Sequence, residues 1–149
     1  MMKILIQRVK KAKVSAEGKT RGEIGKGLLI FVGVEEKDVK EDADYLADKT
    51  ANLRIFSNEN GKFDYSVSDV NGEILSVSQF TLCADTRKGR RPDFTKAAKP
   101  QRARELYEYF NERLKSKGLK IETGIFAAKM EIELTNDGPV TIWMESKQC

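Results

Sequence analysis

A continuous apolar run, Leu28–Val34, places the strongest constraint on how this chain folds. Its β-branched and aromatic residues favour a β-strand, and no polar residue alternates with them. Such a pattern predicts a strand that is covered on both faces, because either face would otherwise expose apolar side chains to water. We therefore expect this strand to lie inside the protein.

A second stretch, residues 73–82, is expected to be a largely buried strand that begins after a turn at Asn71-Gly72. Its second half carries Ser78, Gln79 and Thr81 on a segment that otherwise belongs inside the protein. Buried polar groups cost about 1–3 kcal/mol each unless they are paired. These side chains therefore either satisfy neighbouring backbone groups or line a ligand pocket at the end of the strand.

The remaining pattern predicts one domain over residues 1–149, with two main helices and several more strands. The clearer helix covers about 100–117, where apolar residues recur at three- and four-residue spacing, Pro100 suits the first turn and Gly118 the stop. The other helix covers 38–53. Further extended segments are expected at 3–9 (with a possible continuation at 14–16), 21–24, 54–56, 119–122, 129–135 and 139–145.

Composition excludes several classes of protein. The 149 residues are 40% hydrophobic and 34% charged, and no apolar run approaches the roughly 18–20 residues of a membrane span. The N-terminal residues lack the apolar core and cleavage site of a signal peptide. Two cysteines, Cys83 and Cys149, form no disulfide framework, so we expect a cytoplasmic protein without membrane association.

The chain contains no histidine. A Ser-His or Cys-His relay is therefore impossible, and without a Cys-x-x-Cys pair a zinc site is not expected. There is also no Walker loop and no Gly-x-Gly-x-x-Gly motif, so no metal and no cofactor are predicted. An enzyme of this composition would depend on hydroxyls, amides, carboxylates or its own backbone.

Positive charge is in mild excess, with a formal net charge of +4 and a pI of about 9.0. Residues 85–93 form a basic loop, which suits either a solvated surface or a phosphate backbone. Arg8 is a long cation on a strand that should be partly buried. Taken alone, it is best interpreted as a surface residue whose charged end reaches water.

The segment Asn136–Thr141 has the composition of a hairpin turn between the last two strands. Pro139 cannot donate to a sheet ladder and so belongs at the start or edge of a strand. A cis Gly138-Pro139 bond is a second possibility, since X-Pro bonds are cis in about 5–6% of folded cases. The two carbonyls beside such a bond could then point in a similar direction.

Together, Ser78–Leu82 and Asn136–Thr141 resemble the motif pair of the D-aminoacyl-tRNA deacylases. The similarity spans essentially the whole chain and shows no departure at the motif positions. Either motif alone would be weak, but both in this order, in a histidine-free chain of this length, are specific. Further similar segments are residues 5–9, 54–57, 91–94, 107–110 and 123–130.

The resemblance implies a homodimeric hydrolase of the ester that joins a D-amino acid to the terminal adenosine of tRNA. It also implies removal of glycine from mischarged tRNA, and hence a proofreading role in translation. The implied fold is a compact, barrel-like α/β domain with two packed, largely antiparallel or mixed sheets. The implied partners are the acceptor end of aminoacyl-tRNA and a second copy of the chain, with active sites at the subunit interface.

The same resemblance implies roles for particular residues. Gly138-Pro139 would be cis, held by Arg8, and inserted into the partner's pocket, where it excludes an L side chain. From the residue chemistry itself, Phe80 is well suited to pack on the terminal adenine, and backbone amides near Gln79–Thr81 are candidates to stabilise an oxyanion. The expected catalytic residues are Ser78, Gln79, Phe80 and Thr81, and those expected to bind substrate or select its chirality are Gly138, Pro139, Arg8, Phe126 and Met130.

The role of Thr81 has two interpretations. An unassisted threonine hydroxyl is a weak nucleophile, so we favour an orienting role, with assistance from the ribose hydroxyl next to the ester. An esterase that forms a covalent bond through Thr81 remains an alternative. A non-catalytic RNA-binding dimer is a third possibility, which the basic composition favours.

Overall fold

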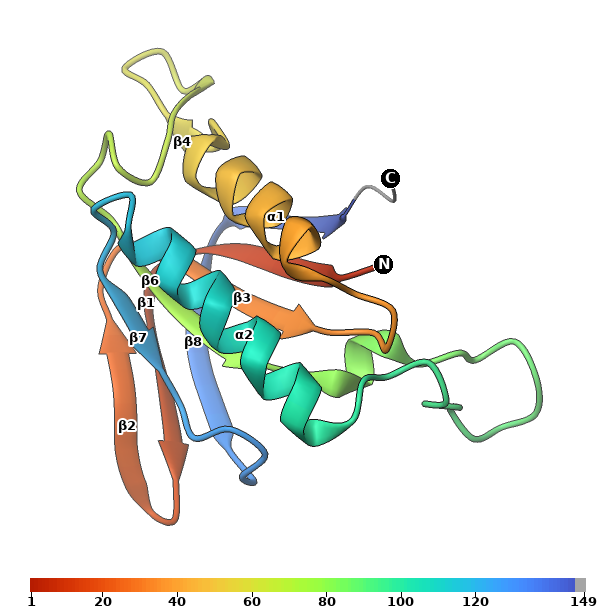
Figure 1. The fold of residues 1–149 in the computed structure, drawn as a ribbon. Coiled ribbons are helices and arrows are strands. Elements are labelled where there is room, and N and C mark those ends of the chain that lie inside the picture. Colours follow the sequence, from red (N-terminus) through yellow and green to blue (C-terminus); the bar gives the residue numbers. More distant parts are fainter. Residues whose placement is uncertain (147–149) are drawn as a thin grey trace.

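The computed structural model describes residues 1–146, so Cys149 lies outside the described residues. Two helices pack on one face of a strongly curled, six-stranded mixed sheet (Figure 1). The strands follow the order β2-β1-β3-β6-β7. Strands β2 and β3 share one edge of the long strand β1, and β8 pairs with its opposite edge. A second, small sheet holds β4 and β5. The elements are β1 Lys3–Ala16, β2 Lys19–Ile24, β3 Gly27–Gly33, α1 Lys40–Asn52, β4 Phe56–Ser57, β5 Phe63–Tyr65, β6 Glu73–Ser78, a 3-10 turn η1 Phe80–Cys83, α2 Pro100–Lys115, β7 Ile121–Thr123 and β8 Glu131–Glu145.

These elements confirm the expected barrel-like α/β fold with two main helices. The apolar run in β3 is covered on both faces, as predicted. Leu28, Ile30 and Val32 belong to the core beneath the helices, whereas Leu29 belongs to a second core on the opposite face of the sheet. The curl of the sheet encloses this second core, in which side chains of β1, β2, β6 and β8 pack together with Leu29.

The predicted strand at 3–9 and its continuation at 14–16 are one long strand, β1. One edge of β1 pairs with β8 along most of its length. The other edge pairs first with β3 and then with β2. Its apolar side chains supply both cores, with Ile4 and Ile6 beneath the helices and Val9 and Val14 on the opposite face. Strand β1 therefore connects three other strands of the sheet and contributes side chains to both cores.

The strand predicted for 73–82 is shorter than expected and ends at Ser78. The Gln79 amide makes one more bond to β3, to the Val32 carbonyl at 2.8 Å, and the chain then turns into η1. Gly33 makes this turn possible, because a Cβ there would lie 2.9 Å from the Cβ of Leu82. The close approach of η1 to β3 therefore requires glycine.

The hairpin turn expected at Asn136–Thr141 is wrong, because β8 is one strand that continues through these residues. Both halves of β8 pair with β1, and the register shifts between them. The Val140 amide donates to Oδ1 of Asn136 at 2.8 Å, so a side chain replaces a ladder bond inside the bulge. The Gly138-Pro139 bond is cis, the isomer that the resemblance implies.

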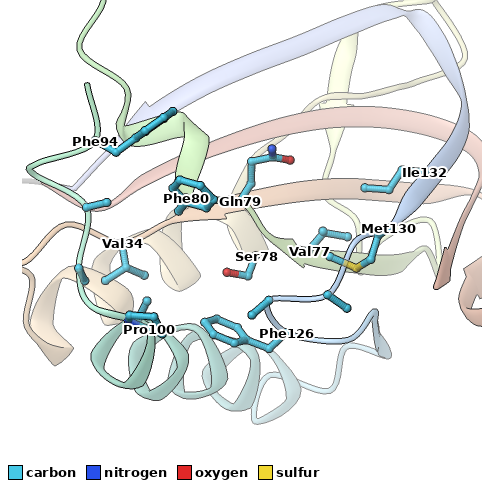
Figure 2. A pocket seen from close by; sticks show the side chains of 15 residues that line it. Val34, Val77, Ser78, Gln79, Phe80, Phe94, Pro100, Phe126, Met130 and Ile132 are labelled. Carbon is cyan, nitrogen blue, oxygen red and sulfur yellow. The ribbon is translucent and has the colours of Figure 1, made fainter. Parts of the chain in front are cut away.

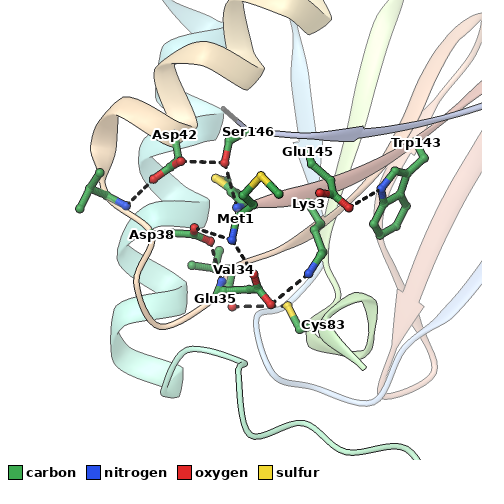
Figure 3. Close-up of polar contacts among 12 residues, drawn as sticks. Met1, Lys3, Val34, Glu35, Asp38, Asp42, Cys83, Trp143, Glu145 and Ser146 are labelled. Carbon is green, nitrogen blue, oxygen red and sulfur yellow. Dashed lines mark hydrogen bonds and ion pairs between the residues drawn. The ribbon is translucent and has the colours of Figure 1, made fainter. Parts of the chain in front are cut away.

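A polar cluster joins the two ends of the described chain to the β3–α1 connection (Figure 3). Glu35 binds both the Met1 amino group and Lys3, the latter with an Nζ–Oε2 distance of 3.0 Å. Ser146 accepts from the Met2 amide and donates to Asp42. No helix among residues 1–146 is long and apolar enough to cross a bilayer.

Candidate functional site

A cavity of about 540 Å³ opens where β6 ends, between η1, the start of α2 and the connection from β7 to β8 (Figure 2). Its lining is mostly apolar, with a few polar groups from one strand end, which is the usual construction of a ligand pocket. The lining residues are Val34, Val77, Ser78, Gln79, Phe80, Phe94, Ala97, Ala98, Pro100, Ala103, Phe126, Ala127, Ala128, Met130 and Ile132.

The polar residues predicted at the end of the strand are gathered at this cavity. Ser78 is half-buried and lines the cavity. Gln79 lines it as well, and its Nε2 donates to Oγ1 of Thr81 at 2.6 Å. Thr81 itself is exposed and does not line the cavity among residues 1–146. The geometry therefore makes Thr81 a hydrogen-bond acceptor for Gln79.

Two aromatic rings form one wall of the cavity (Figure 2). Phe80 and Phe94 meet edge to face, with their ring centroids 5.0 Å apart. Phe80 is nevertheless 56% exposed, because η1 holds it at the rim. A half-exposed ring that is fixed by a second ring offers a flat face on which a planar ligand can stack.

Phe126 and Met130, which the resemblance implies as substrate-binding residues, line the opposite wall of the cavity. The Phe126 ring lies 6.1 Å from the ring of Tyr107, and the Arg104 guanidinium lies 5.8 Å from its centre. The next residue, Ala127, has a φ of 64°, which is uncommon for a residue with a side chain. This wall is therefore a fixed turn rather than a strand.

Backbone amides near the cavity differ in whether they already donate a hydrogen bond within the chain. The Gln79 amide already donates to Val32, so it is not an open donor. The amides of Phe80 and Thr81 begin η1, where a helix offers no internal acceptor, and neither has a backbone acceptor within residues 1–146. The backbone amides of Phe80 and Thr81 are therefore the remaining candidates to bind an oxyanion.

Arg8 is 8% exposed, so its interpretation as a surface residue is wrong. Its Nη1 donates to the Ile55 carbonyl at 2.7 Å, and its Nε donates to the Asp137 carbonyl at 3.0 Å. The guanidinium also lies 5.7 Å from the centre of the Phe63 ring. Arg8 therefore joins the β4–β5 region to the bulge in β8, directly before Gly138.

Glycine is the only residue type that fits position 138 without strain. Its φ is 138°, and a Cβ there would lie 2.7 Å from Cγ2 of Val140 and 3.1 Å from Nη2 of Arg8. Gly138 and Pro139 are both exposed, and within residues 1–146 neither lines the cavity. One chain therefore does not bring its two motifs together.

The titratable groups next to the cavity are unsuited to nucleophilic catalysis. Burial raises the pKa of the Cys83 thiol to about 11, which keeps it protonated at neutral pH. Burial also raises the pKa of Tyr107, although its hydroxyl donates to the Ser76 carbonyl at 2.6 Å. Among residues 1–146, no group of three or more Cys, Asp or Glu side chains could hold a metal ion.

Known proteins have similar sequences and share the fold. A family model described as D-Tyr-tRNA(Tyr) deacylase matches residues 5–145. The chain belongs to the D-Tyr-tRNA(Tyr) deacylase family. Proteins named D-aminoacyl-tRNA deacylase are 56% identical in Bacillus pumilus (strain SAFR-032), over 99% of this chain and 100% of the relative, and 55% identical in Thermotoga petrophila, over 99% of each.

Two solved structures share the fold of this chain. A structure described as c-Myc DNA Unwinding Element Binding Protein superposes with a TM-score of 0.91 at 39% identity, over 98% of this chain and 99% of that chain. A probable eukaryotic D-amino acid tRNA deacylase superposes with a TM-score of 0.86 at 14% identity, over 97% and 98%. The latter likeness shows the shared fold alone.

Sequence reasoning missed two parts of this deacylase-family cavity. Phe94 belongs to one of the segments that resemble the family, but the sequence does not indicate its contact with Phe80, because Phe80 lies in η1 and Phe94 follows the basic loop. Ala127 carries no sequence signal for its positive φ, since alanine gives no indication of a left-handed conformation. Both features follow only from the packing of η1 and the β7–β8 connection around the cavity.

Proposed function

We propose that this protein hydrolyses the ester of D-aminoacyl-tRNA, releasing a free D-amino acid and tRNA. The observation that carries the proposal is membership of the deacylase family over residues 5–145, together with relatives of that name at 52–57% identity. The site chemistry is compatible, because an aminoacyl ester is already activated. The enzyme has mainly to position water and stabilise the developing negative charge.

In the proposed reaction, the amino acid and terminal adenosine occupy the cavity at the end of β6. Phe80 stacks on the adenine, and the amides of Phe80 and Thr81 bind the oxyanion that forms when water attacks the ester carbonyl. Donors of this kind contribute about 3–4 kcal/mol each in well-studied enzymes. The ester C–O bond then breaks, and the ribose oxygen leaves with a proton. The ribose hydroxyl next to the ester assists, and the Gln79–Thr81 hydrogen bond fixes the turn.

Selection against L-amino acids is assigned to Gly138-Pro139 of a second copy of the chain. The support is that both residues are exposed and lie outside the cavity of their own subunit. In a two-fold dimer, each subunit would insert this element into the other's cavity and create two equivalent sites. Its carbonyls would accept from the substrate's α-ammonium and leave no room for an L side chain. Achiral glycine would be accepted, so the proposal includes clearance of glycyl-tRNA as part of cytoplasmic proofreading.

A panel of D-, L- and glycyl-tRNAs tests the activity and its chirality together. We expect D-Tyr, D-Asp and D-Phe esters to be hydrolysed at broadly similar kcat/KM, glycyl-tRNA to be accepted and L-esters to be almost inert. Efficient hydrolysis of an L-ester would show that chirality is not controlled in this way.

Hybrid dimers test the shared site. A Gly138→Ala variant and a Gln79→Ala variant, each less active than the wild type, are mixed and allowed to exchange subunits. One of the two sites in each hybrid then has both elements intact, so part of the activity should return. A fully active monomer in sedimentation and kinetics would refute the shared site.

A second candidate is a nucleic-acid-binding protein without turnover. The basic composition favours it, as does the similarity to the chain described as c-Myc DNA Unwinding Element Binding Protein. Release of D-amino acid from D-aminoacyl-tRNA separates the two candidates, because a binding protein would release none above the spontaneous rate.

A further inference from the structure

The basic loop, residues 85–93, is closed at its base. The Asp85 amide donates to the Asp93 carbonyl at 2.8 Å, and the Asp93 amide donates to the Asp85 carbonyl at 2.9 Å. In Figure 1 the loop projects from the body of the molecule, beyond the N-terminal end of α2. The reciprocal pair of backbone bonds fixes the two ends, so the loop has a defined position relative to the cavity.

The two acidic residues of the loop lie at this base, and their carboxylates already accept hydrogen bonds from neighbouring residues. Asp85 binds Arg87 through both oxygens, with distances of 2.9 Å to Nε and 2.7 Å to Nη2. Asp93 accepts from the amide and the hydroxyl of Thr95. The three remaining cations form the tip and are exposed, and none makes an ion pair or a side-chain hydrogen bond within residues 1–146. They are Lys88, Arg90 and Arg91.

The loop leads directly into the cavity wall. Phe94 follows Asp93 and packs against Phe80 at the rim, and Ala97 and Ala98 continue the lining. Any polyanion whose end occupied the cavity could therefore leave it past the tip cations. Because their charges are not neutralised by this chain, those cations remain available to a partner.

Building on the proposed function, we propose that Lys88, Arg90 and Arg91 bind the sugar-phosphate backbone of the RNA acceptor end, next to the nucleotide that carries the ester. Exposed lysine and arginine side chains bind phosphates without reading bases, so this contact adds affinity and position rather than sequence preference. The loop would thus hold the strand while the cavity holds the terminal adenosine and its amino acid.

Binding of uncharged tRNA tests this inference without requiring catalysis. The variant Lys88→Gln/Arg90→Gln/Arg91→Gln is compared with Lys19→Gln/Lys49→Gln/Lys62→Gln, which removes the same charge from exposed lysines outside the loop. For a single strand, each lost phosphate contact reduces the slope of log affinity against log salt by about 0.7, so the loop variant should be shallower by about 2. The matched variant should keep close to the wild-type slope. Equal slopes for both variants would overturn the inference.

Hydrolysis of a minimal substrate separates this inference from the proposed function. D-Aminoacyl-adenosine carries the ester but no phosphate backbone. The loop variant should retain wild-type kcat/KM on this ester and lose at least tenfold on D-aminoacyl-tRNA at low salt. Equal losses on both substrates would overturn the inference, because the loop would then act on the cavity itself. A wild type that binds tRNA through the loop but hydrolyses neither ester would refute only the proposed function.

Discussion

Arg8 on β1 donates a hydrogen bond from Nε to the backbone carbonyl of Asp137 on β8, at a distance of 3.0 Å. The same guanidinium binds the Ile55 carbonyl, so one buried cation fixes the residue before Gly138 to a segment distant in sequence. Lysine could not make both contacts, because it lacks the planar, forked set of donors. The position of the Gly138-Pro139 element therefore depends on this side chain.

Replacing Arg8 with alanine should lower the free energy of unfolding by about 3 kcal/mol, because a buried carbonyl (Ile55) and a partly buried one (Asp137) lose a charged donor. Arg8→Lys should recover only part of this loss. Urea denaturation measures both values. The control is Arg21→Ala, which removes a side-chain bond to the Ala16 carbonyl from a more exposed arginine and should cost much less. Equal losses of unfolding free energy at the two positions would show that the Arg8 hydrogen bonds make no special contribution to stability.

Thr81→Ala distinguishes an orienting residue from a nucleophile. An orienting Thr81 loses one hydrogen bond from Gln79, worth about 0.5–1.5 kcal/mol, so the single-turnover rate should fall by about 2- to 15-fold. Loss of a covalent nucleophile would instead abolish nearly all activity. Thr81→Ser keeps the acceptor and should remain close to wild type. A trapped acyl-enzyme on wild-type Thr81 would contradict the orienting role.

Phe80→Leu keeps an apolar side chain but removes the ring that packs on Phe94. Stacking on a base is worth about 1–3 kcal/mol, so kcat/KM on D-aminoacyl-tRNA should fall by roughly 5- to 150-fold. Phe80→Tyr retains the ring and serves as the control, with kcat/KM close to wild type. If the leucine variant were as active as the tyrosine variant, stacking by Phe80 would have no part in binding.

Ionisation of Glu35 makes the stability of the fold depend on pH in the acid range. Burial opposes its ionisation, but hydrogen bonds from the Met1 amino group and Lys3 outweigh that effect and lower its pKa below 4.5. A lowered folded-state pKa stabilises the fold above the unfolded value, and this contribution is lost as the pH falls through the folded value. Glu35→Gln should therefore destabilise the protein clearly at pH 7 and much less near pH 3.

Thermal unfolding at a series of pH values measures this dependence, with the exposed neighbour Glu36→Gln as the matched control. The control should shift the melting temperature little at either pH. A Glu35→Gln effect that stayed constant between pH 3 and pH 7 would mean that charge on Glu35 does not contribute.

The sequence by itself determined the features that depend on local pattern. The unbroken apolar run fixed β3 as a strand covered on both faces, and three- and four-residue spacing fixed α2. The absence of histidine excluded Ser-His and Cys-His relays. The motif pair, Ser78–Leu82 and Asn136–Thr141, also indicated the family from sequence alone, because both motifs are short and contiguous.

Only the tertiary structure decided the features that depend on distant partners. Residues 136–139 have the composition of a turn, yet β1 is long enough to pair with both sides of them, and those ladder bonds favour one strand with a bulge. Arg8 is buried because carbonyls of Ile55 and Asp137 surround it, and neither is near it in sequence. Strand β6 stops at Ser78 because Gly33 lets η1 approach β3. Local propensities of this kind are worth about 1 kcal/mol, so a set of long-range hydrogen bonds and buried contacts readily exceeds them.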